Sequence, residues 1–320
     1  MADFVVQSVL GTRSVLGTET LDAGAARKIL DTAFFFKNHW REFAFRDSPV
    51  AGKTVVLFFY EASTRTRVSF ELAAKRLGAN TVFLGDSGTS MGKGETLYDT
   101  ARTLEAMQPD VLVLRHPSAG SPHLLSKILK VPVINAGDGF HEHPTQALLD
   151  AMTIEEFKGS IAGLKVLIVG DIAHSRVARS NIYLLKTLGA EVSVCGPPTL
   201  LPPKTEQLGV KVFYDIDKAV AEQDVVILLR IQFERFESGQ TPSKGEYQKF
   251  FGMTNRVAAL CKPDVLVMHP GPVNRGVELS TEVADGPHSV ILNQVSNGVM
   301  VRMALLHLLT GGQVLKGDAK

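Results

Sequence analysis

Cysteine is scarce in this chain. Of its 320 residues only two are cysteines, Cys195 and Cys261, and they lie far apart in stretches predicted to form a strand and the end of a helix. Such cysteines are typical of core thiols and argue against a disulfide framework or a cysteine metal site. We therefore expect a reducing, cytoplasmic setting.

An excess of charge of one sign is also missing. The 34 lysines and arginines nearly balance the 33 aspartates and glutamates, which leaves a net charge of +1. A chain without a strong overall field has little general attraction for nucleic acids or anionic membranes. We expect neither as a partner, and any basic cluster must therefore serve a local site.

Long apolar runs are lacking too, since no stretch approaches the length that spans a membrane. Residues 1–6 have neither the basic start nor the apolar stretch of a secretory signal. The chain shows no internal repeat and no low-complexity segment. Its length, with 45% hydrophobic residues, suffices for two domains of ordinary size.

Strand-like and helix-like runs alternate along almost the whole chain. This alternation predicts two doubly wound, parallel-sheet α/β domains with helices on both faces. The predicted strands are residues 54–60, 80–84, 110–115, 131–135, 164–169, 191–195, 211–214, 224–229, 264–268 and 289–293. The predicted helices are residues 21–38, 67–77, 96–107, 122–130, 145–157, 176–188, 216–222, 247–260 and 297–309. We expect the domain boundary near Gly137–Pro144, with helix 145–157 joining the halves.

Polar clusters follow many of the predicted strands directly. They are Arg65, Arg115–His116, His141 with His143, Asp171–Arg176, Arg230–Gln232 and His269–Pro272. In open α/β sheets, ligands bind beyond the carboxyl ends of the strands. We therefore expect the active site in a cleft between the two domains.

The pentad Ser63-Thr64-Arg65-Thr66-Arg67 lies where a strand is predicted to give way to a helix. Backbone N–H groups and the helix dipole favour an anion at such a point. Hydroxyls and guanidiniums add donors suited to phosphate oxygens. A simple Ser/Thr N-cap beside solvated arginines is the alternative for each residue taken singly, but the combination favours an anion site.

Arg115 and His143 could both reach a carbonyl oxygen near this anion site, and such donors stabilise negative charge at an acyl centre. A structural role for His143 is an equal alternative, with Thr145 capping a helix. The Gln146 amide can donate and accept at once, which suits a carbamoyl group.

Arg176, Arg230 and Gln232 fall in the second predicted half. Guanidiniums at these places would suit a ligand with two carboxylates. Surface arginines in weak ion pairs are the alternative.

Three apparent motifs fail on inspection. Residues 170–175 lack the second and third glycines of G-x-G-x-x-G, and the glycine-rich stretch 87–94 lacks the G-x-x-x-x-G-K-[ST] frame. That stretch fits a lid or a plain surface loop equally well. His141 and His143 form an H-x-H without an evident third ligand, so we expect no metal and no nicotinamide cofactor.

Several segments resemble the catalytic chains of aspartate carbamoyltransferases, and the resemblance extends over nearly the whole length of the chain. They are Phe59–Arg67, Lys93–Thr96, Arg115–Pro117, Gly137–Gly139, His143–Gln146, Gly170–Arg176, Arg230–Gln232, His269–Pro272 and Asn274–Gly276. The S-T-R-T-R and H-P-T-Q pieces are shared with ornithine carbamoyltransferases and define only the superfamily. Ornithine enzymes typically carry a cysteine in H-C-L-P, whereas this chain has His269-Pro270-Gly271-Pro272. Arg230 with Gln232 also suits a side-chain carboxylate better than an ammonium group.

The resemblance implies transfer of the carbamoyl group from carbamoyl phosphate to L-aspartate, an early step of pyrimidine synthesis. It implies carbamoyl phosphate contacts from Ser63, Thr64, Arg65, Thr66, Arg115, His143, Gln146, Pro270 and Gly271, and aspartate contacts from Lys93, Arg176, Arg230 and Gln232. Catalytic roles fall to Arg65, Thr66, Arg115, His143 and Lys93.

The resemblance also implies a homotrimer in which the neighbouring subunit supplies Ser90 and Lys93. Regulatory chains or a dihydroorotase could join a larger assembly. No cofactor is implied. Residues 1–143 with a returning C-terminal segment 295–320 would bind carbamoyl phosphate, and residues 144–294 would bind aspartate.

Two other functions remain as alternatives. An ornithine carbamoyltransferase would have the same fold with a different acceptor. A non-catalytic paralogue that binds phosphate-bearing metabolites is disfavoured, because Arg65, Lys93, Arg115, His143 and Arg230 are all present.

Overall fold

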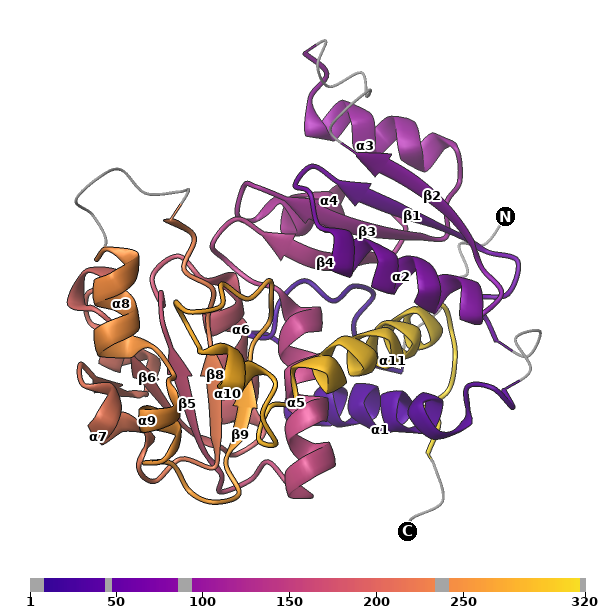
Figure 1. Ribbon diagram of the computed structural model, residues 1–320. Helices are drawn as coiled ribbons and strands as arrows, with labels where there is room; N and C mark the ends of the chain where they lie inside the picture. The colour runs from indigo at the N-terminus through magenta and orange to yellow at the C-terminus, as the bar shows by residue number, and fades with distance from the viewer. Residues whose placement is uncertain (1–8, 44–47, 86–93, 234–241, 317–320) are drawn as a thin grey trace. The chain divides into compact units, whose positions relative to one another are not determined.

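Two α/β units make up the chain (Figure 1). The computed structural model describes residues 9–43, 48–85, 94–233 and 242–316. One unit comprises Met1–Met152 with Val295–Lys320, and the other comprises Thr153–Gln294. The divisions fall inside helices α5 (Pro144–Lys158) and α11 (Ile291–Leu309), so both helices begin in one unit and end in the other.

The first unit is built on a four-stranded parallel sheet. Its strands are β1 (Thr54–Phe59), β2 (Asn80–Gly85), β3 (Val111–His116) and β4 (Val133–Asp138), in the order β2-β1-β3-β4. The register pairs Phe59 at the end of β1 with Arg115 at the end of β3. The carboxyl ends of these two central strands therefore lie side by side.

Helices cover this sheet, and their bounds are α1 (Ala23–His39), α2 (Thr64–Arg76), α3 (Leu97–Ala106) and α4 (Ser121–Ile128), with parts of α5 and α11. Ala101 of α3 and Leu125 of α4 pack against Val56 and Phe58 of β1. Val55 and its neighbours on the other face are equally buried, because side chains alternate along a strand and both faces are covered. Figure 1 shows α11 running between α1 and α2.

The second unit holds a five-stranded parallel sheet in the order β7-β6-β5-β8-β9. Its strands are β5 (Lys165–Val169), β6 (Glu191–Cys195), β7 (Lys211–Phe213), β8 (Val225–Leu228) and β9 (Leu266–Met268). Its helices are α6 (Arg176–Thr187), α7 (Ile216–Val220), α8 (Lys244–Phe251), α9 (Asn255–Ala258) and α10 (Thr281–Ala284), with short 3₁₀ turns at Pro198–Leu200 and Thr205–Leu208. Two parallel-sheet α/β units are the predicted fold class, which is confirmed.

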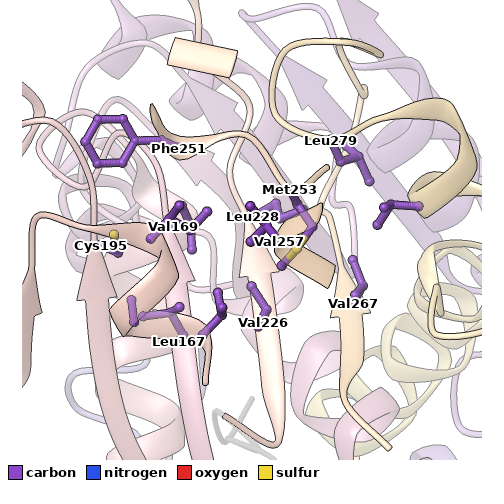
Figure 2. Packing of buried hydrophobic residues seen from close by; sticks show 14 of the residues in the cluster. Leu167, Val169, Cys195, Val226, Leu228, Phe251, Met253, Val257, Val267 and Leu279 are labelled. Atoms are coloured by element: carbon purple, nitrogen blue, oxygen red, sulfur yellow. The ribbon is translucent and has the colours of Figure 1, made fainter. Parts of the chain in front are cut away.

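A hydrophobic cluster lies on one face of this second sheet (Figure 2). Leu167 and Val169 of β5 pack there with Leu228 of β8 and Met253. Cys195 of β6 is a free thiol inside the same cluster, and burial raises its pKa to about 12. The thiol is therefore protonated and acts as a small apolar side chain.

Two predicted elements are wrong. Residues 289–293 do not form a strand: Ser289 makes an isolated bridge with Val267, and α11 already begins at Ile291. A short β-branched run carries a weak strand signal that periodicity alone cannot separate from a helix. The predicted helix 247–260 is two helices, because Met253 leaves the helical path to bridge Leu279.

Among the described residues, the helices are too short or too polar to cross a membrane.

Substitution of a core leucine should destabilise the second unit, whereas the same change on the surface should not. Leu228 is 1% exposed and Leu292 is 82% exposed. We expect Leu228→Ala to lower the free energy of unfolding by about 2–5 kcal/mol and Leu292→Ala to change it by less than about 0.5 kcal/mol. Urea denaturation followed by circular dichroism measures both. Equal effects of the two variants would contradict the assignment of β8 to the core.

Candidate active site

The predicted anion site lies at the start of α2, which follows β1 after a short connection. Ser63 is the N-cap in extended conformation (φ −159°), and its side chain makes no capping hydrogen bond. The first intrahelical bond runs from Arg67 N to Ser63 O at 3.1 Å. The backbone N–H groups of Thr64, Arg65 and Thr66 therefore point out of the positive end of the helix. Thr64 and Arg65 are exposed there, and Thr66 is buried.

Arg302 of α11 lies directly behind this helix end and is 3% exposed. Its guanidinium donates to Ser69 Oγ at 2.8 Å, to Gly298 O at 3.0 Å and to Thr145 Oγ1 at 3.3 Å. Burial lowers the pKa of Arg302 to about 9; the positive charges of Arg115 and Arg65 act in the same direction, and the Asp150 carboxylate opposes them. Three guanidiniums therefore lie within electrostatic reach of one another. An arrangement of this kind favours a ligand with more than one negative charge.

Arg115 is the penultimate residue of β3 and is held from two sides. Its Nη1 donates to Ala136 O at 3.1 Å, and its Nη2 donates to Glu61 Oε1 at 2.6 Å. Glu61 lies in the short connection between β1 and α2, so this ion pair joins the strand end to the predicted anion site. A ligand oxygen that takes a hydrogen bond from Nη2 must compete with the Glu61 carboxylate. The sequence alone gives no sign of this role for Glu61.

His143 and Gln146 lie at the start of α5. His143 is buried, and its carbonyl accepts a hydrogen bond from Gln146 N at 3.0 Å. The Gln146 side chain donates from Nε2 to Asp150 Oδ1 at 2.9 Å, which turns its amide oxygen away from Asp150. That oxygen can accept from an amide N–H of a ligand, as the sequence predicts.

Two groups of side chains bring ligand atoms within 4.8 Å of one another and could hold a cation: His123 with Asp138 and His141, and Glu19 with His141 and Glu142. However, the Asp138 carboxylate already accepts hydrogen bonds from Gly120 N, Asn135 Nδ2, Glu142 N and the His141 ring. Asp138 therefore fixes the conformation of the loop before His143 by accepting these hydrogen bonds. Because its carboxylate oxygens are already used as acceptors, few lone pairs remain to coordinate a metal ion.

In the second unit, Arg176 opens α6. Asp171 follows β5, is buried, and accepts hydrogen bonds from His174 N at 3.0 Å and from the His174 ring at 3.0 Å. Burial raises the pKa of Asp171, and the hydrogen bonds from His174 oppose that shift. Ser175 Oγ caps the helix by accepting from Ala178 N at 3.1 Å. These bonds fix the turn that presents Arg176.

Arg230 and Gln232 follow β8, which is the neighbour of β5 in the sheet. Ile231 between them is fully buried in the hydrophobic cluster, while its two neighbours are half-buried. Alternation along an extended backbone places Arg230 and Gln232 on the same side. Since the register pairs Val169 with Leu228, the turn before Arg176 and the Arg230 segment leave the sheet side by side.

Pro270 and Gly271 follow β9 in the second unit. Gly271 adopts φ +66°, and its N–H donates to His269 Nδ1 at 2.8 Å. His269 N in turn donates to Gln294 Oε1 at 2.9 Å. The buried His269 ring therefore holds the turn in place.

The candidate residues divide between the units. The first unit brings together Ser63, Thr64, Arg65, Thr66, Arg115, His143 and Gln146, and the second contains Arg176, Arg230, Gln232, Pro270 and Gly271. Ser90 and Lys93 lie outside the described residues. The individual roles of all these residues stay predictions.

Arg302 lies in a helix without a recognisable motif. The only signal in the sequence is that no other Asp, Glu, Lys or Arg occurs in this helix.

Comparison with known proteins identifies related sequences along nearly the whole chain. The carbamoyl-P binding domain of the aspartate/ornithine carbamoyltransferases matches residues 13–156, and their Asp/Orn binding domain matches residues 162–309. The aspartate carbamoyltransferase catalytic subunit of Syntrophotalea carbinolica is 55% identical over 308 residues, which cover 96% of this chain and 98% of that protein.

Solved structures agree with this similarity. The ornithine carbamoyltransferase from Pyrococcus furiosus superposes with a TM-score of 0.83 at 33% identity, covering 96% of this chain and 99% of the other. The aspartate transcarbamoylase from Trypanosoma cruzi, in complex with carbamoyl phosphate and aspartate, gives a TM-score of 0.81 at 30% identity over 93% of this chain and 96% of the other.

Removal of the Arg302 charge should weaken anion binding at the start of α2, because one of three neighbouring positive charges is lost. We expect Arg302→Gln to raise the dissociation constant of inorganic phosphate about fivefold, which corresponds to roughly 1 kcal/mol at an effective dielectric constant suited to such sites. Calorimetric titration measures this constant. Arg102→Gln, an exposed arginine paired with Glu105, is the control. An unchanged phosphate affinity in folded Arg302→Gln would contradict the role of Arg302.

Proposed function

The chain belongs to the aspartate/ornithine carbamoyltransferase family, and we propose that it transfers the carbamoyl group of carbamoyl phosphate to the amine of L-aspartate. The products are N-carbamoyl-L-aspartate and phosphate, as in the early pyrimidine pathway. The match of relatives named aspartate carbamoyltransferase at 55% identity supports this acceptor. The free, protonated thiol of Cys195 suits the cytoplasm, where we place the enzyme.

Two arginines that follow strands of the second sheet favour aspartate over ornithine as the acceptor. Arg176 and Arg230 follow neighbouring strands β5 and β8, with Gln232 beside Arg230. Guanidiniums form strong, bidentate bonds with carboxylates, and they repel an ammonium group. Aspartate offers two carboxylates to this edge, whereas the side chain of ornithine offers a positive charge.

Carbamoyl phosphate is the ligand of the first unit. Its phosphate oxygens accept hydrogen bonds from the N–H groups at the start of α2, from the Ser63 and Thr64 hydroxyls and from the Arg65 guanidinium. Its carbonyl oxygen takes hydrogen bonds from Arg115 and His143, and Gln146 accepts from its amino group. The ion pair with Glu61 at 2.6 Å holds this arginine in position before the substrate arrives, and its remaining N–H groups can donate to the ligand.

Carbamoyl transfer then needs little chemistry from the protein itself. The neutral amine of aspartate attacks the carbonyl carbon, and the oxyanion that forms is stabilised by Arg115, His143 and Thr64. The carbon–oxygen bond to phosphate breaks, and the departing phosphate accepts the proton of the amine. The catalytic gain comes from the positioning of two anions and from fixed donors around the oxyanion.

The wild-type chain is expected to carbamoylate aspartate and not ornithine.

Loss of the Arg230 charge should weaken the binding of aspartate and leave the binding of carbamoyl phosphate unchanged. We expect Arg230→Ala to raise the KM for aspartate by at least about tenfold, because a charge-assisted hydrogen bond is worth about 1.5–3 kcal/mol. Steady-state kinetics and calorimetry with carbamoyl phosphate measure the two ligands separately.

The matched control is Arg256→Ala, an exposed arginine of the same unit that pairs with Asp217. It should leave both constants unchanged. Equal losses of aspartate and carbamoyl phosphate affinity in Arg230→Ala would contradict the assignment of Arg230 to the acceptor.

The working enzyme is a homotrimer in this proposal. Support comes from β2, the edge strand of the first sheet, where Val82 and Phe83 are exposed. Val68 and Leu72 of α2 and Tyr98 of α3 are exposed as well. An open edge strand with apolar side chains is a surface that proteins normally cover. A second copy of the chain is the expected cover, and its Ser90 and Lys93 complete the site.

Complementation between two inactive variants tests this shared site. Arg65→Ala and Lys93→Ala should each be nearly inactive, because each removes a cation from the same site. When subunits exchange, some trimers acquire an interface with neither lesion. We therefore expect the mixture to regain a fraction of wild-type activity well above either parent. Native mass spectrometry confirms the exchange. Confirmed exchange without recovery would show that Lys93 does not act in a neighbour's site.

A further inference from the structure

We propose that Glu278 is a positioning residue for the amino-acid acceptor. Its carboxylate ties the segment that carries Arg230 and Gln232 to the turn that carries Pro270 and Gly271. The inference rests on the proposed function and adds to it a residue that neither touches the substrate nor belongs to a recognised motif.

The first observation is the number of donors that converge on this carboxylate. Glu278 is 1% exposed. Its Oε1 accepts hydrogen bonds from Ile231 N at 2.9 Å and from Asn274 Nδ2 at 2.7 Å, and its Oε2 accepts from Asn274 N at 2.8 Å. Asn274 Nδ2 also donates to Ile231 O at 3.2 Å. Both backbone polar groups of Ile231 are therefore held by Glu278 and Asn274.

Ile231 is the residue between Arg230 and Gln232. Its side chain is locked in the hydrophobic cluster, and its backbone is locked by Glu278. A displacement of this one peptide moves the two flanking side chains together. Binding groups that must lie within a fraction of an ångström of their productive geometry depend on such support.

The second observation links Glu278 to the turn after β9. His269 Nδ1 accepts the hydrogen bond from Gly271 N, so a neutral ring carries its proton on Nε2. That Nε2 lies 3.8 Å from Glu278 Oε2, and both side chains are fully buried. At this distance the ring and the carboxylate lie near each other without a hydrogen bond, while Nδ1 holds the turn. The hydrogen bonds of Glu278 to the loop after β9 are those with Asn274, so one carboxylate is bonded to this loop and to the Arg230 segment.

A buried carboxylate has a free-energy cost that an apolar residue would avoid. Burial raises the pKa of Glu278, and the hydrogen bonds from Ile231 and Asn274 oppose this shift. A carboxylate is suited to this place because its two oxygens can accept several hydrogen bonds at once. A glutamine at the same position would turn an N–H₂ group toward one of these donors.

The test compares Glu278→Gln with three other variants by steady-state kinetics. We expect Glu278→Gln to raise the KM for aspartate roughly tenfold and to lower kcat, because the acceptor is held in the wrong place. The dissociation constant of carbamoyl phosphate should stay within twofold of wild type. Asn274→Ser, which removes the bonds of the Asn274 side chain, should shift the KM for aspartate in the same direction by a smaller factor. If Glu278→Gln does not fold, the KM for aspartate of Asn274→Ser tests the proposal by itself.

Two controls separate positioning from general loss of structure. Glu222→Gln makes the same chemical change at an exposed ion pair with Lys165. Val226→Ala weakens the core of the same unit and lowers Tm without touching Glu278. Both should keep the KM for aspartate within twofold of wild type.

An aspartate KM that is unchanged in both Glu278→Gln and Asn274→Ser would overturn the proposal. An equal rise in Val226→Ala at equal loss of Tm would overturn it too. A wild-type chain that carbamoylates neither aspartate nor ornithine would remove the proposed function and, with it, this inference.

Discussion

Parallel pairing of strands is the constraint on which the rest of this structure depends. Parallel strands point their carboxyl ends to one edge of the sheet, and each strand is followed there by a loop and a helix. Phe59 pairs with Arg115 in the first unit, and Val169 pairs with Leu228 in the second. Residues that are 56 or 59 positions apart along the chain thereby become neighbours. The register of the strands therefore determines where each binding segment lies.

The free-energy cost of placing charges close together or in the interior explains which charged residues lie beyond the carboxyl ends of the strands in the two sheets. In the first unit, burial lowers the pKa of Arg302 to about 9, and repulsion from Arg115 and Arg65 adds to this shift. Glu61 offsets part of this repulsion through its bond to Arg115. Substrate anions would offset more of it, which ties ligand binding to the electrostatic balance of the unit. Buried carboxylates such as Asp138 and Glu278 instead accept backbone hydrogen bonds and shape loops.

Local sequence patterns predicted the parts of this account that depend on local physics. Apolar runs predicted the strands of both sheets, whereas the anion site predicted from the hydroxyls and arginines of Ser63–Arg67 stays a prediction. Residues 289–293 were mispredicted because tertiary contacts, and not β-propensity, decide a run of that length. Arg302 and Glu278 could not be found in this way. Arg302 meets Ser69 from 233 residues away, and Glu278 meets Ile231 from 47 residues away. Only the folded chain reveals these partners.

The central claim is that this chain moves a carbamoyl group onto the amine of aspartate, and the identity of the product tests it most directly. Purified protein is incubated with ¹³C-labelled carbamoyl phosphate and an equal mixture of ¹⁵N-labelled aspartate and ¹⁵N-labelled ornithine, and the products are followed by NMR. The account predicts one new carbonyl signal, coupled to the ¹⁵N of N-carbamoyl-L-aspartate, with equimolar phosphate. A carbonyl signal coupled to the side-chain nitrogen of ornithine, or labelled substrate lost only to hydrolysis, would contradict it.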